Sequence, residues 1–308
     1  KDFFRLTSVP LPEEVRPRPV LLRAFARLER LWEGHRESVI AKATKPTEIE
    51  TSDAENPISA FNKEQADTSI NYEYLCSQTK AIRQDLRIQR INDVFTVEVY
   101  ETHARWALQC HDMNEYAGCQ TRLAELYRSG LQSRSIGEFT AYNLLYLTTL
   151  TLNKRSNQGG SSVLKLLREI ALAGRAQDLK DSKGRVGLSS ASAKDPSVAH
   201  ALRVRAAVVN ENHFQFFKLL RETPHLGDLI LLPIVDTFRA LAIAKIVKGY
   251  KPSVPRSLVA RQVGLEDQSE ECEEFLRRLG VPVDADGNIQ TRNVTVDISR
   301  AHAGASLL

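Results

Sequence analysis

Residues 95–110 read FTVEVYETHARWALQC, and the spacing of their side chains decides the fold class. At about 100° per residue, one stripe of a helix collects Phe95, Val99, His103, Trp106 and Cys110. Asp112 is the predicted N-cap of a second helix, with Glu115 as its capping-box partner. The apolar stripe of that helix consists of Tyr116, Cys119, Leu123, Leu126 and Tyr127. The stretch therefore predicts two amphipathic helices joined by a short turn.

The same helical spacing continues in both directions from this pair. Leu75, Ile82 and Leu86 share a narrow arc of a preceding helix, and a further helix is predicted from about residue 138 to residue 152. Helices of this length that alternate with short turns pack as antiparallel pairs, and stacked pairs form a solenoid. No strict repeat motif is present. The predicted fold class is all-α, a helical solenoid of tetratricopeptide (TPR) type over residues 20–250.

Proline-rich and polar stretches interrupt this pattern. Residues 1–19 are predicted to form an extended strap, because prolines 10, 12, 17 and 19 fix the backbone there. A helix is predicted to follow over residues 20–32. Polar residues then replace the apolar spacing at residues 35–69 and 174–194, which are predicted to be flexible insertions. Further helices are predicted at residues 162–173, after Asp195-Pro196, and from about residue 236 to residue 250.

After Pro252 the pattern changes to short helices followed by β-prone runs. Helices are predicted at residues 257–263, with Ser257 as the cap, and at residues 269–279. Asp286-Gly287 between β-prone runs predicts a hairpin. This order is typical of a winged helix, predicted for residues 251–300, with a tail at residues 301–308. The hairpin is expected to expose an apolar β-surface as a partner interface, formed by Val281, Val283, Ile289, Val294 and Val296.

The composition excludes several classes of protein. A chain of 308 residues with 42% hydrophobic and 26% charged residues buries a core without disulfide or metal staples. Its longest apolar run, residues 229–235, is far shorter than the roughly 18 residues of a membrane span. The start at Lys1 and the single methionine, Met113, indicate a segment of a longer protein.

No pattern of catalytic residues is present. The four cysteines have scattered spacings and are predicted to be free, largely buried thiols of a reducing compartment. The alternative, a zinc site, has ligand spacings unlike the usual paired patterns; its ligands would be His103, Cys110, His111 and Cys119. No nucleotide-binding, hydrolase or metalloprotease motif occurs, and His103 is expected to be a core histidine. We therefore predict no catalytic activity, no metal and no cofactor.

The clearest functional signal is a run of positive charge near the end of the predicted solenoid. Between Arg239 and Leu265 there are six cations and no acidic residue. Lys245 and Lys248 project away from the apolar arc of their helix. Exposed cations of this kind suit a phosphate backbone. The predicted nucleic-acid-binding residues are Lys245, Lys248, Lys251, Arg256, Arg261, Arg277 and Arg278.

Other interpretations of the basic residues remain open. An acidic partner protein, or an ordinary solvated face, would account for the same charge. The last predicted helix opens with Glu270 and Glu271, which repel phosphate, so sequence-specific reading of a DNA groove is not expected. A second basic stripe, formed by Arg83, Arg87 and Arg90, is either a docking face or a set of solvated arginines, and the solvated interpretation is favoured.

Several strings of the sequence resemble one known family. KAIRQDL at residues 80–86 and FTVEVYETHAR at residues 95–105 look like the core signature of the Sac/GANP family. Supporting strings are FRLT at 4–7, VRP at 15–17, CQTRL at 119–123, GEFTAY at 137–142 and PSVAHAL at 196–202. The resemblance is closest to the branch of leukocyte-receptor-cluster-member-like and yeast Thp-type proteins, and it runs from about residue 2 to residue 300. The insertions at residues 35–69 and 174–194 depart from the pattern.

The resemblance implies a PCI domain, which is a helical solenoid that ends in a winged helix. It implies a non-enzymatic nuclear scaffold that pairs with a second PCI-domain protein and holds a small acidic DSS/Sem-type protein. Such an assembly is a platform for RNA and also for DNA in transcription elongation, mRNA processing and splicing, and mRNA export. The alternative is a purely protein-binding adaptor that makes no direct contact with nucleic acid.

Overall fold

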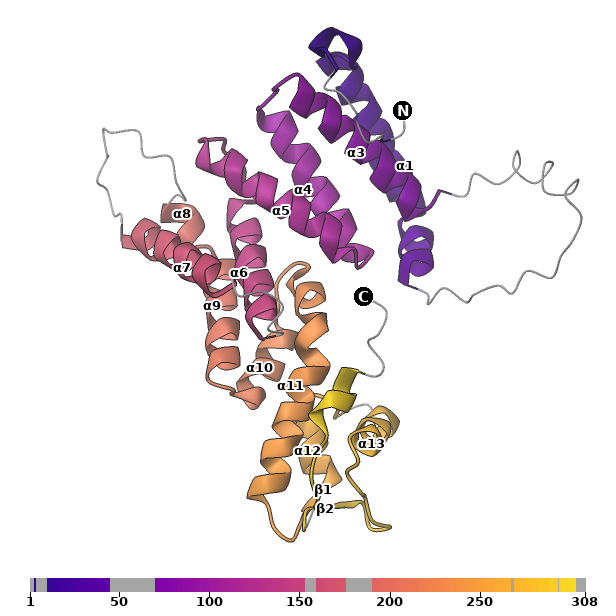
Figure 1. The fold of residues 1–308 in the computed structure, drawn as a ribbon, viewed down its shortest axis with the longest axis vertical. Helices are drawn as coiled ribbons and strands as arrows, with labels where there is room; N and C mark the ends of the chain where they lie inside the picture. Colours follow the sequence, from indigo (N-terminus) through magenta and orange to yellow (C-terminus); the bar gives the residue numbers. More distant parts are fainter. Residues whose placement is uncertain are drawn as a thin grey trace, which may run out of the picture. The chain divides into compact units, whose positions relative to one another are not determined.

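The computed structural model describes residues 3, 10–44, 70–152, 159–175, 190–266, 269–292 and 294–302 (Figure 1). Its contacts divide the chain into two compact units, Lys1–Ser133 and Arg134–Leu308. The described parts of both units are mostly helical, and the second also contains a small two-stranded sheet. This confirms the prediction of an all-α fold with a small β element. Within the described residues, every helix is too short or too polar to cross a membrane.

The first unit consists of long helices connected by short turns. Its elements are η1 (Pro12–Glu14), α1 (Arg18–Thr44), α3 (Tyr72–Ile88), α4 (Val94–Gln109) and α5 (Met113–Arg128). The stripe predicted on α4 packs against α1 and α3 around two tryptophans, Trp32 and Trp106, whose rings stack with centroids 5.1 Å apart. Phe25 of α1 packs edge-on against Phe95 at 5.8 Å. Aromatic pairs of this geometry contribute beyond the apolar area that they bury.

Helix α1 corrects two predictions about the N-terminal region. It begins at Arg18, so Pro19 occupies the first helical turn, where its missing N–H costs nothing. It also continues to Thr44, through the first part of the predicted insertion. The reason is burial, because Val39 is 0% exposed and packs into the core of this unit. The rest of that insertion, residues 45–69, lies outside the described residues, as do residues 176–189 of the second insertion.

Two turns of the first unit, after α3 and after α4, use left-handed residues other than glycine. After α3, the N–H of Arg90 donates to the carbonyl of Arg87 at 3.1 Å, and the N–H of Ile91 donates to that of Leu86 at 3.0 Å. This is a Schellman motif, with Arg90 at φ 55°, where glycine is favoured. His111 after α4, at φ 58°, occupies the equivalent position. Short turns of this kind make neighbouring helices antiparallel, as the spacing predicts.

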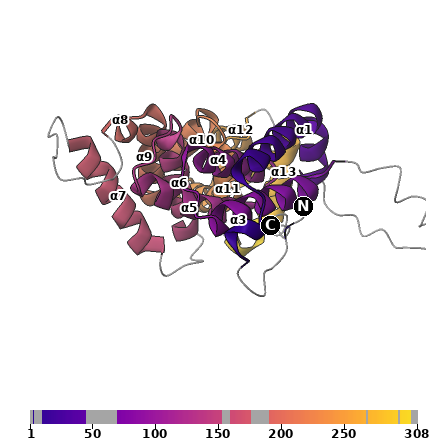
Figure 2. The same ribbon diagram turned by 90° about the horizontal axis from the view of Figure 1, so that it is seen from above.

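The second unit begins with α6 (Ile136–Leu152), α7 (Gly159–Arg175), α8 (Ser190–Ala193), α9 (Pro196–Val209), α10 (His213–Arg221) and α11 (Gly227–Gly249). Helices α7 and α8 lie side by side in both views (Figure 1, Figure 2). Asp195 caps α9 as predicted, since its side chain accepts from the Ser197 N–H at 2.8 Å. Helix α11 starts earlier than predicted and includes Pro233. Its residue Phe238 packs against Phe216 of α10, with ring centroids 4.5 Å apart.

The C-terminal part contains β1 (Ser253–Pro255), α12 (Arg256–Gln262), α13 (Ser269–Arg278), β2 (Asn288–Gln290) and η2 (Ile298–His302). The predicted hairpin reduces to a single bridge between Val283 and Ile289. The sheet instead pairs β1 with β2 in antiparallel register, with Val254 opposite Ile289. Pro282 explains the difference in part, because proline cannot donate to a ladder. The predicted Ser257 cap is also wrong, since the N-cap of α12 is Pro255.

Candidate functional site

Four of the predicted nucleic-acid-binding residues have no carboxylate partner among the residues that the structure describes. Lys248, Arg261 and Arg277 lie exposed in the last turns of α11, α12 and α13. The negative end of each helix dipole favours a cation there. Lys251 follows α11, and its Nζ donates to the carbonyl of Thr291. These four residues, Lys248, Lys251, Arg261 and Arg277, are called the open cations below.

The other three predicted residues form ion pairs within the protein. Lys245 pairs with Glu211, and Arg256 pairs with Glu273 of α13. Arg278 lies 3.6 Å from Asp236 of α11, and its guanidinium covers the ring of Phe275 at 4.9 Å. The interpretation of an acid-free surface is therefore wrong in space, although the stretch is acid-free in sequence. The carboxylates belong to Glu211, Asp236 and Glu273, and all three lie outside residues 239–265 in the sequence.

The predicted apolar partner surface is largely inside the protein. Val281 is 3% exposed and Ile289 is 0% exposed, while Val283, Val294 and Val296 are half-buried. The expectation of an exposed apolar β-surface is thus wrong for Val281 and Ile289. Ile289 is enclosed because it lies between Val254 and Val283 in the sheet. Partner binding at this part of the chain stays a prediction.

The first unit contains a buried polar cluster that the sequence did not predict. Arg83 of α3 directs its Nη1 to His103 Nδ1 of α4 at 2.9 Å and to Cys119 Sγ of α5 at 3.1 Å. The same nitrogen contacts the carboxylate of Glu115, whose second oxygen lies 2.6 Å from Lys80 Nζ. These five residues, the Arg83 cluster, tie three helices together. The prediction of a solvated arginine is therefore wrong for Arg83.

Local structure explains how the cluster forms. On the helical wheel of α3, Arg83 lies beside Cys76 and Thr79, which are both buried and extend the apolar arc toward it. Small residues at these positions were the signal that the sequence offered for its burial. Glu115 stands in the first turn of α5, where the helix dipole favours an acid. Asp112 caps α5 as predicted, but the Glu115 carboxylate contacts Lys80 and Arg83.

The Arg83 cluster brings together atoms that also bind metals. The ligand atoms of His103, Glu115 and Cys119 lie within 4.8 Å of one another. The Arg83 guanidinium, a permanent cation, is in hydrogen-bond contact with all three. Burial also raises the pKa of the Cys119 thiol to about 12, so it is protonated at neutral pH. This donor set does not fit a metal ion, and neither Cys110 nor His111 of the alternative zinc site belongs to it.

The four cysteines are free and buried, as predicted. Burial raises the pKa of the Cys110 thiol to about 12, with the Asp112 carboxylate adding to the effect. A thiol of high pKa in an apolar environment is a poor nucleophile. The cysteines of the chain are therefore packing residues.

His103 makes the first unit sensitive to acid. Burial, with Arg83 and Lys80 nearby, holds the pKa of His103 well below 6.5, and its Nδ1 must stay unprotonated to accept from Arg83. The unfolded chain binds this proton below about pH 6.5 and the folded chain does not, so stability falls as pH falls. We expect His103 to contribute a loss of about 1.4 kcal/mol per pH unit below that value.

Urea unfolding at a series of pH values measures this loss. Tryptophan fluorescence reports on the first unit, because the two tryptophans, Trp32 and Trp106, both lie in it. His103→Gln should flatten the pH dependence, whereas His35→Gln, at an exposed position, should leave it as in the wild type. Equal slopes in all three proteins would show that His103 does not carry the effect.

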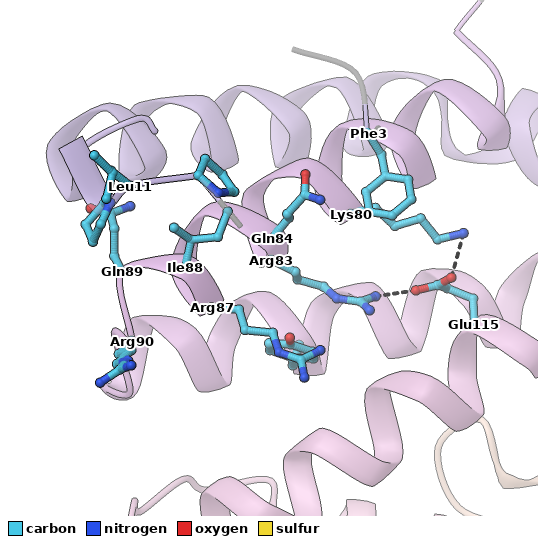
Figure 3. A pocket seen from close by; sticks show the side chains of 13 residues that line it. Phe3, Leu11, Lys80, Arg83, Gln84, Arg87, Ile88, Gln89, Arg90 and Glu115 are labelled. Atoms are coloured by element: carbon cyan, nitrogen blue, oxygen red, sulfur yellow. Dashed lines mark hydrogen bonds and ion pairs between the residues drawn. The ribbon is translucent and has the colours of Figure 1, made fainter. Parts of the chain in front are cut away.

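A pocket of about 930 Å³ lies beside the Arg83 cluster (Figure 3). Leu11 and Gln89 are at one end, Phe3 and Lys80 are at the other, and Arg83 and Arg87 lie between them. The lining residues come from the N-terminal segment, α3, α4 and α5. The sequence predicted only the arginine stripe of this pocket, because the lining residues of the N-terminal segment, α4 and α5 are distant from α3 in the chain.

The sequence of this chain is similar to those of one family of known proteins. The sequence model of the SAC3/GANP family matches residues 58–285. This chain belongs to the SAC3/GANP family. It is 31% identical to SAC3 family protein A of Arabidopsis thaliana over 94% of its length, and 30% identical to a THP3 homolog of Schizosaccharomyces pombe over 92%. It is 31% identical to the leukocyte receptor cluster member 8 homolog of Xenopus laevis over 91%.

The chain spans only part of each of these SAC3/GANP relatives. It covers 24% of the Arabidopsis protein, 57% of the fission-yeast protein and 28% of the Xenopus protein. The family and the branch inferred from the strings at residues 80–86 and 95–105 are confirmed.

Proposed function

We propose that this SAC3/GANP-family chain is a non-enzymatic nuclear scaffold that holds RNA through the C-terminal part of its second unit. The proposed setting is transcription-coupled mRNA maturation, from elongation through processing and splicing to export. Family membership supports this setting, since the resemblance of the sequence implies it. The proposed partners are a second PCI-domain protein and a small acidic DSS/Sem-type protein, with the winged-helix-like arrangement of α12, α13 and the sheet contributing to the pairing.

The observation that carries the RNA-binding proposal is the set of open cations. They keep their charge available to a ligand, while nearby cations such as Lys245 are already neutralised. Tyr250, which precedes Lys251, is 50% exposed and offers a ring on which a base can stack. The exposed Glu270 and Glu271 open α13 with negative charge, so contacts with the phosphate backbone are favoured over reading of base edges.

Neutralising the open cations tests this proposal. The triple variant Lys248→Gln/Arg261→Gln/Arg277→Gln is expected to bind a fluorescein-labelled single-stranded RNA about tenfold more weakly, because lost phosphate contacts release fewer counterions. The slope of log affinity against log salt should fall by about 2, at roughly 0.7 per contact. Fluorescence anisotropy at several KCl concentrations measures both quantities, and the loss should be similar for unrelated RNA sequences.

A second triple variant provides a matched control. Arg221→Gln/Lys245→Gln/Arg256→Gln removes the same charge from the same unit, at cations that are paired with Glu266, Glu211 and Glu273. It should retain most of the affinity and most of the salt slope. If both variants lose affinity equally, net charge rather than the open cations drives binding. If neither loses affinity, the purely protein-binding adaptor is the better description.

A further inference from the structure

We propose that the pocket beside the Arg83 cluster is a docking site for an acidic linear peptide with an apolar side chain between its carboxylates. The site belongs to the first unit, and the open cations belong to the second. The inference is therefore independent of RNA binding at the open cations, and it deepens the proposed function at one point, because it names a site that suits an acidic partner.

The lining of the pocket has an apolar side. It is formed by Phe3, Pro10, Leu11 and Pro12 of the N-terminal segment and by Ile88 of α3. Leu11 is 62% exposed and Phe3 is 40% exposed, so these side chains are open to a ligand. Exposed apolar side chains gathered at a pocket are typical of a binding site rather than of ordinary surface.

The other side of the pocket is cationic, with an excess of charge. Both oxygens of Glu115 are engaged by Lys80 and Arg83. Arg87 and Arg90 are exposed, and no carboxylate within the described ranges pairs with either. Arginine is suited to carboxylates, because its planar fork forms two parallel hydrogen bonds with them. The pocket thus offers two guanidinium groups that a ligand carboxylate can neutralise.

Arg90 occupies a backbone position that disfavours arginine. It lies at φ 55° in the turn after α3, in the left-handed region where glycine is favoured over any residue with a side chain. The turn itself needs no cation, since its hydrogen bonds come from the backbone. The side chain of Arg90 lines the pocket.

The spacing of the arginines favours an extended peptide. Arg83 and Arg87 lie one helical turn apart on α3, about 6 Å along the axis, and Arg90 follows in the turn after the helix. Alternate side chains of an extended chain are about 6.6 Å apart, so a carboxylate at Arg87 leaves a second one within reach of the neighbouring cations of the pocket. The Tyr100 ring is buried and covered by Arg83 at 4.8 Å, so of the two aromatic rings that line the pocket only Phe3 is open to a stacking base.

Selection from a random dodecapeptide library displayed on phage tests the proposal with the whole chain. Sequences enriched on the wild-type protein should carry Asp or Glu at alternate positions around a leucine or an aromatic residue. Fluorescein-labelled synthetic copies should bind about tenfold more weakly to Arg87→Gln/Arg90→Gln, because two charge-assisted contacts are lost. Leu11→Ser should also weaken binding, since it removes part of the apolar side.

Three controls separate docking from folding and from general charge. Arg23→Gln/Arg27→Gln removes the same charge from exposed positions of α1 outside the pocket, and should change peptide affinity less than about twofold. Arg90→Gly removes one cation while relieving the left-handed backbone, so it should bind more weakly without a lower melting temperature. Arg87→Gln/Arg90→Gln should leave RNA affinity at the open cations unchanged.

Each of three outcomes would overturn the proposal. These are a selection that enriches no peptide, enriched peptides that lack acidic residues, and binding of the peptides to Arg87→Gln/Arg90→Gln with full affinity. Displacement of a bound peptide by the single-stranded RNA would also overturn it, because the pocket would then take nucleic acid instead.

Discussion

Replacing Arg83 by methionine is expected to lower the free energy of unfolding of the first unit by about 3 kcal/mol. The Arg83 side chain is 17% exposed and the Glu115 side chain 10% exposed, so the pair is largely removed from water. Without the guanidinium, His103 Nδ1 and one Glu115 oxygen lose their donor. Lys80 still contacts the other oxygen, which places the loss at the low end for a broken buried ion pair.

Urea unfolding followed by tryptophan fluorescence measures this loss in the first unit. Arg87→Met is the matched control, because it makes the same substitution one helical turn later at an exposed position. Its effect should stay within about 0.5 kcal/mol. Similar losses in the two variants would mean that the Arg83 cluster adds nothing beyond the helical propensity and the charge of α3.

The Arg83 cluster draws most of its residues from the strings that resemble the SAC3/GANP family. The string at residues 80–86 supplies Lys80 and Arg83, the string at 95–105 supplies His103, and the string at 119–123 supplies Cys119. The string at 15–17 meets the same helix, because Arg16 Nε lies 2.6 Å from the buried Asp85 carboxylate. In this chain the strings therefore contribute polar contacts that hold the helices of the first unit in one arrangement.

Periodicity predicted the helices whose apolar stripe is dense and failed where the stripe is sparse. Helices α4 and α5 carry a large side chain at nearly every turn, and their limits were close to those observed. The second half of α1 is rich in charged residues, with Val39 as its fully buried side chain. Its partner helix, α3, begins after residue 70, so the stretch alone does not reveal that Val39 will be buried.

At the candidate sites, the sequence also did not show which charged residues would pair. A stretch of sequence shows which acids are neighbours along the chain, whereas Glu211 and Glu273 reach Lys245 and Arg256 only after folding. The pocket of the first unit likewise combines Leu11 with arginines more than seventy positions away. Long-range pairing of this kind is fixed by tertiary packing and leaves no local periodic signal.

Gly137→Ala is expected to lower the free energy of unfolding of the second unit by about 2–3 kcal/mol. A Cβ added at residue 137, near the start of α6, would lie 2.6 Å from the Cβ of Asp195, where no contact of that length is tolerated. Relieving this clash costs about 1–3 kcal/mol, and displacing Asp195 also weakens the cap of α9, worth about 1 kcal/mol. Alanine gains at most about 1 kcal/mol in helix propensity, which is smaller.

Gly160→Ala is the matched control, because Gly160 is also the second residue of its helix, α7, in the same unit, and no atom lies within 4 Å of an added Cβ. It should be neutral or stabilise by up to about 1 kcal/mol. Hydrogen exchange read by mass spectrometry on peptides from α6 and α9 measures both variants, since the tryptophans report only on the first unit. Gly137→Ala should accelerate exchange in both helices. If its exchange matches that of Gly160→Ala, the contact between residue 137 and Asp195 does not hold α6 and α9 together.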